Sequence, residues 1–190
     1  VFGLHNLPEL PVGTVGVKAG PLMSFKDGFR IKFIGKSGHT STPQKNVDPT
    51  VAIASLVMSL ETIISRNVGP LESAVLTVCS IQSGTPFTTT IDDAEITGNI
   101  RSLEEDVRER ILKRVELMAH GTAEEFGCAC ELELIPITRG VFNSESLLKA
   151  ASDAGAAVFG VENVKVPSVT MASEAFSLLS EGVPSFFYFL

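Results

Sequence analysis

"MSFKDGFRIKFI", residues 23–34, alternates apolar and polar side chains and runs into the polar connector "GKSGHTSTPQKNVDPT", residues 35–50. An alternation of this kind predicts a half-buried β-strand with one face toward a core. The apolar face carries Met23, Phe25, Phe29, Ile31 and Phe33, and the opposite face carries Lys26, Arg30 and Lys32. The connector that follows ends the strand and leads to a change of periodicity.

Beyond the connector the apolar residues recur at helical spacing. Asp48 is a residue type that caps helices, and Pro49 fits the first helical turn, so the sequence predicts a helix beginning there. Its apolar stripe comprises Val51, Ile53, Ala54, Val57, Leu60 and Ile64. Two further strands are predicted at 73–82 and 93–102, separated by a stretch that contains Gly and Pro.

A second helix and a fourth strand complete the pattern. "SLEE", residues 102–105, predicts a capping box in which Ser102 and Glu105 begin the helix, and Gly127 is expected to end it. The helix has apolar residues at Val107, Ile111, Val115, Met118 and Phe126. The strand that follows, "CACELELIP", places Cys128, Cys130, Leu132 and Leu134 on one face. We interpret the two cysteines as core residues, because a zinc site needs a second pair of ligands.

Residues 23–136 therefore read β-α-β-β-α-β, which is typical of a ferredoxin-like unit with two helices on one face of an antiparallel sheet. The flanking segments have a different pattern. They predict a helix at 144–159, a strand at 164–170, a helical turn after Ser173, and a strand buried on both faces in "PSFFYFL", residues 184–190. We expect an α/β domain that is interrupted by the ferredoxin-like unit.

Composition limits the classes of partner. The net charge is −7, and an acidic chain is a poor partner for nucleic acid or for an anionic membrane surface. No uninterrupted apolar stretch approaches the roughly 20 residues of a membrane helix, and "VFGLHNLPEL" lacks the features of a signal peptide. Three cysteines provide no disulfide framework. We therefore expect a cytoplasmic protein that acts on small molecules or proteins.

Two histidines are candidates for chemistry. His39 lies in a polar loop without apolar periodicity, and it is either a functional group or a solvated loop residue. His5 follows an apolar triplet that resembles the end of a buried strand, where ligands tend to emerge in α/β sheets. The sequence supplies no second metal ligand at a suitable spacing from His5, so it does not predict a complete metal site. His120, with Glu116 and Glu124 nearby, is expected on a solvated helix face.

The order of several motifs resembles a known family. They are "GLHNLPELPVGTVGVKAGPLM" (3–23), "FRIKFIGKSGHTSTPQKNVDPT" (29–50), "AEITGNIRS" (94–102) and "MASEAFSLL" (171–179). They are similar to the aminoacylase branch of the metallopeptidase family that includes acetylornithine deacetylase and carboxypeptidase G, with hippurate hydrolases and indole-acetyl-amino acid hydrolases as members.

The resemblance implies a fold and a division of the chain. It implies an α/β protein with an α+β lid: a ferredoxin-like dimerisation domain at 22–138, inserted into a partial phosphorylase/hydrolase-like α/β catalytic domain at 1–21 and 139–190. Family members are roughly twice as long and hold two divalent ions, zinc or manganese. Most of their metal ligands have no counterpart here, so the segment alone is expected to bind no metal and to be inactive.

The resemblance also implies roles for individual residues. His5 matches a metal ligand. His39 matches a lid histidine that reaches across a homodimer and stabilises the oxyanion when metal-activated water attacks the amide of an N-acyl amino acid. Arg101 matches an arginine that binds the substrate carboxylate, although a strand-end salt bridge is the alternative.

Two departures from the family pattern concern substrate binding. In "FTTTIDD", residues 87–93, Thr88 replaces an asparagine that helps to bind substrate. In the "MASEAF" stretch Glu174 is retained as a substrate-site residue, or as a carboxylate in the first turn of a helix, and Ala175 replaces an acidic neighbour. The rival hypothesis is a free-standing ferredoxin-like module that dimerises or binds a small ligand without catalysis.

Overall fold

A computed structural model describes residues 1–190 and divides the chain into two compact units. One unit is Asp27–Ile137, and the other combines Val1–Lys26 with Thr138–Leu190. The first of these contains the ferredoxin-like pattern. Each unit is described separately below.

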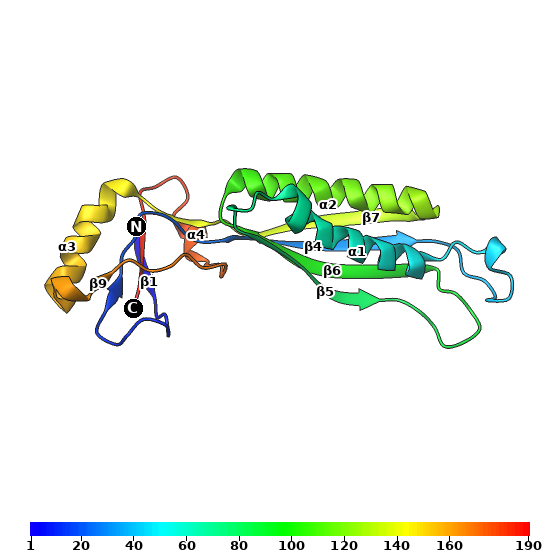
Figure 1. Cartoon of the computed structure of the whole chain (residues 1–190), viewed down its shortest axis with the longest axis horizontal. Coiled ribbons are helices and arrows are strands. Elements are labelled where there is room, and N and C mark those ends of the chain that lie inside the picture. The colour runs from blue at the N-terminus through cyan, green and yellow to red at the C-terminus, as the bar shows by residue number, and fades with distance from the viewer. The chain divides into compact units, whose positions relative to one another are not determined.

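The Asp27–Ile137 unit is built on a four-stranded sheet in the order β5-β6-β4-β7. Its elements are β4 (Phe25–Ile34), a short 3-10 helix η1 (Pro43–Lys45), α1 (Pro49–Asn67), β5 (Ala74–Gln82), β6 (Asp93–Ser102), α2 (Glu105–Phe126) and β7 (Ala129–Thr138). Helices α1 and α2 lie on the same side of the sheet (Figure 1). This order confirms the predicted β-α-β-β-α-β arrangement.

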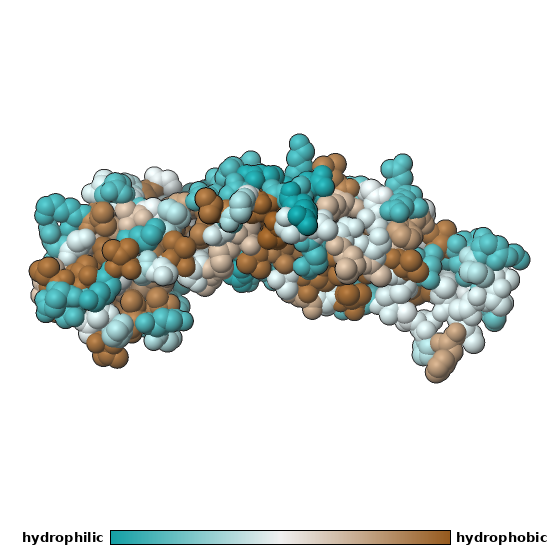
Figure 2. All heavy atoms as spheres, in the orientation of Figure 1, coloured by the Kyte–Doolittle hydropathy of each residue, from teal (hydrophilic) through white to brown (hydrophobic).

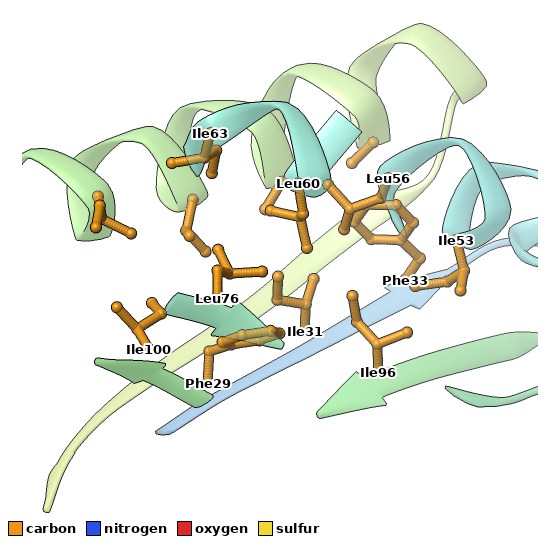
Figure 3. Packing of buried hydrophobic residues seen from close by; sticks show 14 of the residues in the cluster. Phe29, Ile31, Phe33, Ile53, Leu56, Leu60, Ile63, Leu76, Ile96 and Ile100 are labelled. Carbon is orange, nitrogen blue, oxygen red and sulfur yellow. The ribbon is translucent and has the colours of Figure 1, made fainter. Parts of the chain in front are cut away.

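Helix α1 begins where its capping residue predicts. The Asp48 side chain accepts a hydrogen bond from the Thr50 N–H at 2.9 Å, and Pro49 occupies the first turn. The apolar face of the helix then packs on the sheet, as Figure 3 shows for Ile53, Leu56 and Leu60. Beneath them are Phe29, Ile31, Phe33, Ile96 and Ile100, all 0–1% exposed. Burial of these side chains is the main source of stability in this unit.

Helix α1 is also long and apolar enough to cross a membrane by length and composition alone. The helix is interrupted by Ser55, Ser59 and Glu61, so it is not the uninterrupted apolar stretch that the sequence was expected to lack. Leu56, Leu60 and Ile63 are fully buried against the sheet, so a core helix accounts for the composition.

The two ends of helix α2 differ in how well the sequence predicts them. The capping box is wrong, because α2 starts at Glu105 and no side chain caps it. Ser102 still pairs with Ala74 in the β5–β6 ladder, which keeps it extended as the last residue of β6 and leaves its hydroxyl without a partner. The C-terminal prediction is confirmed: Gly127 has φ 71° and donates to the carbonyls of Ala123 and Glu124.

The strand predicted at 23–34 is broken at Ser24. Strand β3 (Gly20–Met23) ends before this residue and β4 begins after it. The Ser24 N–H donates to the Ala172 carbonyl at 2.9 Å and its hydroxyl donates to the Met171 carbonyl at 2.8 Å, which diverts the chain locally. Met23 therefore joins the core that contains Leu22 and Val141 rather than the one that contains Phe29.

The other unit contains a mixed sheet in the order β1-β10-β2-β9 and a two-stranded pair, β3 with β8. Its remaining elements are β1 (Phe2–His5), β2 (Val15–Gly16), β8 (Val141–Asn143), η2 (Glu145–Leu147), α3 (Leu148–Phe159), η3 (Val161–Asn163), β9 (Val164–Lys165), α4 (Phe176–Leu179) and β10 (Phe186–Phe189). Strand β10 is buried, as predicted, and pairs in parallel with β1.

Two predictions in this unit need correction. Strand β1 is exposed rather than buried, with Phe2 and Leu4 more than half accessible, because it lies at the edge of the sheet. The strand expected at 164–170 stops at Lys165, since Pro167 lacks the N–H that a longer ladder would use.

Gly98 is the glycine on which the core of the Asp27–Ile137 unit depends most. A Cβ at this position would overlap the Phe29 ring and the Thr77 carbonyl. We expect Gly98→Ala to reduce the free energy of unfolding by about 2–3 kcal/mol, because the packed ring has nowhere to move. Urea titration of the 190-residue chain measures this loss.

Gly121→Ala is the matched control, because a Cβ at Gly121 in α2 meets nothing within 4 Å. Alanine is a better helix former than glycine, so this variant should gain about 0.5–1 kcal/mol. Equal effects from the two substitutions would contradict the packing argument.

Candidate active site

The loop that carries His39 connects β4 to α1 and is tied to the segment before β6. The Ser37 N–H donates to Asp92 Oδ1 at 2.8 Å, and the Gly35 N–H donates to the Asp92 carbonyl at 2.7 Å. Gly38 and Thr90 exchange two hydrogen bonds of 3.0 Å. Hydrogen bonds from Ser37, side chain and backbone, lower the pKa of the Asp92 carboxyl, so the carboxylate that holds the loop is charged at neutral pH.

His39 is exposed, and its ring is held from one side only. The Ser41 N–H donates to His39 Nδ1 at 3.1 Å, and Ser41 Oγ lies 2.7 Å from the same nitrogen. The backbone carbonyl of His39 accepts from Asn46 Nδ2 at 3.3 Å and from the Thr42 N–H at 3.1 Å. Nε2 makes no hydrogen bond within the chain, so this edge of the ring is available to a ligand. Figure 2 shows that the surface at this end, on the right of the view, is mostly hydrophilic to neutral.

Two glycines allow the loop to pack this closely. A Cβ at Gly38 would overlap the side-chain oxygen of Asn46, which is the residue that holds the His39 carbonyl. A Cβ at Gly35 would overlap the Val47 carbonyl. This carbonyl accepts a hydrogen bond of 2.8 Å from the Lys36 N–H, which joins the two sides of the loop. The two glycines of "GKSGH" are therefore explained by the close approach of Val47 and Asn46 to the backbone at Gly35 and Gly38. The sequence alone did not predict these contacts.

Thr88 lies beside the His39 loop. Its carbonyl accepts from the Thr40 N–H at 3.1 Å and from Thr40 Oγ1 at 3.3 Å. The preceding residue, Phe87, has φ 71° and is 94% exposed, an unusual combination for a bulky side chain. The structure thus brings Thr88 and His39 to the same end of the sheet, and it adds Phe87, which was not among the residues predicted from the sequence.

Arg101 is partly buried and lies far from His39 within the same chain. It faces away from Ile100, whose side chain packs under the helices, and it pairs with Val75 of β5. His39 bridges to Thr89 just before β6 begins, whereas Arg101 lies near the end of that strand. Eight residue steps of about 3.3 Å from Asp93 to Arg101 separate the two ends by roughly 26 Å. One chain therefore does not bring these two predicted residues together.

His5 and Glu174 are adjacent in the other unit. His5 Nδ1 lies 3.2 Å from Glu174 Oε2, and the side chains are 55% and 23% exposed. His5 ends β1, and Glu174 precedes the short helix α4. Gly3 makes the approach possible, because a Cβ there would lie 2.6 Å from the Phe176 ring that packs against β1. The sequence did not predict this contact.

Glu174 has a second function in the local structure. Its Oε1 accepts from the Phe176 N–H at 3.4 Å, and its carbonyl accepts from Ser177 Oγ at 2.8 Å. Both bonds fasten the start of α4. The carboxylate therefore acts as a helix-start acceptor and as a partner of His5 at the same time.

The predicted metal ligand His5 does not belong to a cluster of possible ligands. No group of three or more His, Cys, Asp or Glu side chains is arranged to hold a metal ion. His5 has an exposed ring whose Nδ1 is engaged by a carboxylate and whose Nε2 makes no bond within the chain. A carboxylate beside one ring nitrogen is common for histidines that bind metal, and the metal-ligand role of His5 stays a prediction.

Comparison with known proteins gives a consistent set of matches. Residues 26–125 match the model of the peptidase dimerisation domain of the M20 group. The N-acetylcysteine deacetylase of Bacillus subtilis (strain 168) is 36% identical over 190 residues, which is 100% of this chain and 50% of that protein. The N-acetyldiaminopimelate deacetylase of Anoxybacillus flavithermus is 32% identical over 190 residues, with the same coverage.

Solved structures agree with the sequence matches. The Bacillus subtilis YXEP protein, a dinuclear metal binding peptidase from the M20 family, has a TM-score of 0.78 and 30% identity and covers 99% of this chain and 46% of its own. A structure from methicillin-resistant Staphylococcus aureus has a TM-score of 0.91 at 26% identity, covering 100% and 49%. The chain thus spans about half the length of the curated relatives it matches.

Proposed function

The chain belongs to the M20 peptidase family, whose dimerisation domain it contains, and we propose that the complete protein hydrolyses the amide bond of N-acyl amino acids. Within the family we place it in the aminoacylase and hippurate hydrolase branch. Residues 22–138 are the lid that dimerises, and residues 1–21 and 139–190 are parts of the catalytic domain. The names of two relatives, deacetylases of N-acetylated amino acids, support the substrate class. Three cysteines, which provide no disulfide framework, support a cytoplasmic location.

The observation that carries this proposal is the geometry of His39. Its ring is exposed at the end of a tethered loop, is held through Nδ1, and offers Nε2 outward. A donor preorganised in this way can stabilise the oxyanion that forms when water adds to an amide carbonyl. Because the loop is already fixed by Asp92 and Thr90, little ordering remains to be done when substrate binds.

A homodimer explains the separation of His39 from Arg101. A site that uses both residues must take them from different chains, since His39 lies beyond the start of β6 and Arg101 lies near its end, and β6 spans roughly 26 Å between Asp93 and Arg101. Arg101 binds the substrate carboxylate through two hydrogen bonds, and His39 of the opposing lid completes the site. Thr88, beside His39, contributes a hydroxyl where the family usually has an amide.

His5 holds one of two divalent metal ions, zinc or manganese, and the other ligands lie outside these residues. When bound, the metal supplies Lewis-acid activation of the carbonyl and of the attacking water. The part played by this chain is to orient the His5 ring through Glu174 and to supply the oxyanion donor and the carboxylate anchor. The dinuclear relative supports two metal ions, and the choice of zinc or manganese rests on the family resemblance.

Hydrolysis assays on the full-length protein test the proposal. We expect release of free amino acid from N-acetyl amino acids, loss of activity after chelation, and recovery on addition of zinc or manganese. The 190-residue chain, which lacks most ligands, should be inactive under the same conditions. If the full-length protein dimerises but hydrolyses no member of an N-acyl amino acid panel with any divalent metal, the non-catalytic module becomes the better hypothesis.

A further inference from the structure

We propose that Asn99 accepts a hydrogen bond from the amide N–H of the substrate and so orients the bond that is cleaved. The inference rests on the proposed function, in which Arg101 binds the substrate carboxylate. Asn99 lies two residues before Arg101 on β6, and side chains two residues apart on a strand share a face. Ile100, between them, is buried in the core under the helices. Asn99 and Arg101 therefore share the open face of the sheet, the side away from α1 and α2.

The side-chain amide of Asn99 is held in one orientation by Cys79. Asn99 Nδ2 donates to Cys79 Sγ at 3.3 Å, and the thiol donates to the Thr77 carbonyl at 3.8 Å. Because the S–H is directed to this carbonyl, the sulfur can only accept from Asn99, so the NH₂ group lies on the Cys79 side. The amide oxygen Oδ1 then points elsewhere and makes no hydrogen bond within the chain. It presents an acceptor to a ligand.

An irregularity in β5 creates the contact between Cys79 and Asn99. The ladder pairs Val78 with Gly98 and Ser80 with Thr97, so Cys79 is an extra residue without a partner strand residue. Such a β-bulge changes the direction of a side chain, and bulges are frequent beside active sites. The bulge and the fixed amide are two separate features, and both occur next to the predicted carboxylate anchor.

The neighbouring strand β4 has no side chain that could bind the Asn99 oxygen at this point. Asp27 and Phe29 are buried on the core face of β4, so Gly28 between them belongs to the open face. Gly28 lies close to Gly98, because a Cβ built on Gly28 would be 3.9 Å from the Gly98 carbonyl. Asn99 Oδ1 therefore remains available beside a position that carries only hydrogen.

The spacing of Asn99 and Arg101 suits an N-acyl amino acid. Two residue steps of about 3.3 Å place their Cα atoms roughly 6.6 Å apart on one face. In an N-acyl amino acid the carboxylate and the amide nitrogen are bonded to the same carbon, so a guanidinium and an amide oxygen can bind both groups at once. A carboxylate anchor alone lets the scissile amide rotate, whereas two contacts fix its direction.

An ester analogue tests the hydrogen bond. O-acetyl-L-lactate has the shape and the carboxylate of N-acetyl-L-alanine, but an ester oxygen replaces the N–H. In the full-length protein, Asn99→Ala should lower kcat/KM for the amide by about tenfold, the effect of one hydrogen bond. It should leave kcat/KM for the ester unchanged, because the ester has no hydrogen to donate to Asn99.

Equal losses on the amide and on the ester would overturn the inference. If turnover of the ester is too slow to follow, its competitive inhibition of amide hydrolysis gives the same comparison. Asn99→Ala should then leave the inhibition constant of the ester unchanged, and an inhibition weakened as much as amide hydrolysis would equally overturn the inference.

Thr97→Ala is the matched control. Thr97 lies on the same face of β6, two residues farther from Arg101, and its hydroxyl is 2.8 Å from that of Ser80. This variant should leave kcat/KM for both substrates unchanged. A loss as large as that of Asn99→Ala would show that any substitution on this face lowers activity, which would contradict a specific role for Asn99.

Variants of Cys79 test its part as a positioning residue. Cys79→Ala leaves the Asn99 amide free to rotate and should lower kcat/KM for the amide by roughly 2–5-fold, with no change for the ester. Cys79→Ser keeps an atom that can accept from Asn99 Nδ2 and should restore the wild-type value. Wild-type kinetics in Cys79→Ala would refute the positioning role of Cys79.

The proposed function and this inference can fail in different ways. A full-length protein that hydrolyses no N-acyl amino acid would refute the proposed function and the role of Asn99 with it. Hydrolysis in which Asn99→Ala acts equally on amide and ester would refute the role of Asn99 alone.

Discussion

Replacing His39 with alanine in the full-length protein is expected to lower kcat by about 10²–10³-fold, the loss that follows removal of one oxyanion donor. KM should stay near its wild-type value, because the interaction forms only as charge develops on the carbonyl oxygen. Steady-state kinetics on the best N-acyl amino acid measures both constants. His120→Ala, which removes an exposed histidine on α2, is the matched control and should leave kcat unchanged.

Mixing subunits tests whether His39 acts across a dimer. Neither His39→Ala nor Arg101→Ala homodimers should be active, because every site lacks one residue. In a mixed dimer, one site combines Arg101 from the first chain with His39 from the second. Random exchange should therefore restore about one quarter of wild-type activity, since half of the dimers are mixed and each has one complete site. Mixtures no more active than the parents would place both residues in the same chain's site.

Replacing Asp27 with alanine is expected to cost about 3 kcal/mol of unfolding free energy, the largest stability effect that we predict. Asp27 lies on the core face of β4, and its side chain is 3% exposed. Arg108 of α2 binds both carboxylate oxygens, at 2.6 and 2.7 Å. The hydrogen bonds to Asp27 raise the pKa of the Arg108 guanidinium, so it remains charged. Loss of the Asp27 carboxylate leaves the largely buried charge of Arg108 without its partner. Breaking a buried ion pair typically costs about 3–5 kcal/mol, and we expect the lower value because the Arg108 side chain is 20% exposed.

The double variant Asp27→Val with Arg108→Met distinguishes a stranded charge from lost attraction. Replacing both members of a buried pair with apolar residues is often neutral, so the double variant should recover most of the stability lost by Asp27→Ala. Urea titration of the 190-residue chain at pH 7 provides the comparison. A double variant as unstable as the single variant would contradict this explanation.

The Asp27–Arg108 pair also shows a limit of reasoning from sequence. The alternation around Phe29 and Ile31 predicts the strand and its buried face, and position 27 lies on that face. An aspartate at this position interrupts the apolar face of the strand. Its partner is 81 residues away, and only the packing of α2 over β4 brings the two together.

The candidate site was predicted unevenly for the same reason. His39 stood out because a histidine in a polar loop has no core to explain it, and the structure finds it exposed. The tethers to Asp92 and Thr90 could not be predicted, since they come from a segment that is distant in sequence. His5 and Glu174 were selected separately through a family resemblance, and their contact appeared only in the structure.

By itself the sequence determined the order of helices and strands in the ferredoxin-like unit, the start of α1 at Asp48 and the end of α2 at Gly127. These features depend on side chains a few residues apart, where periodicity and capping act locally. Only the tertiary structure decided that Ser102 remains in the sheet, that Asp27 is paired, and which nitrogen of each functional histidine is engaged. Those outcomes depend on partners that folding brings together from far along the chain, and local preference yields to them because a buried or fixed polar group must find its partner.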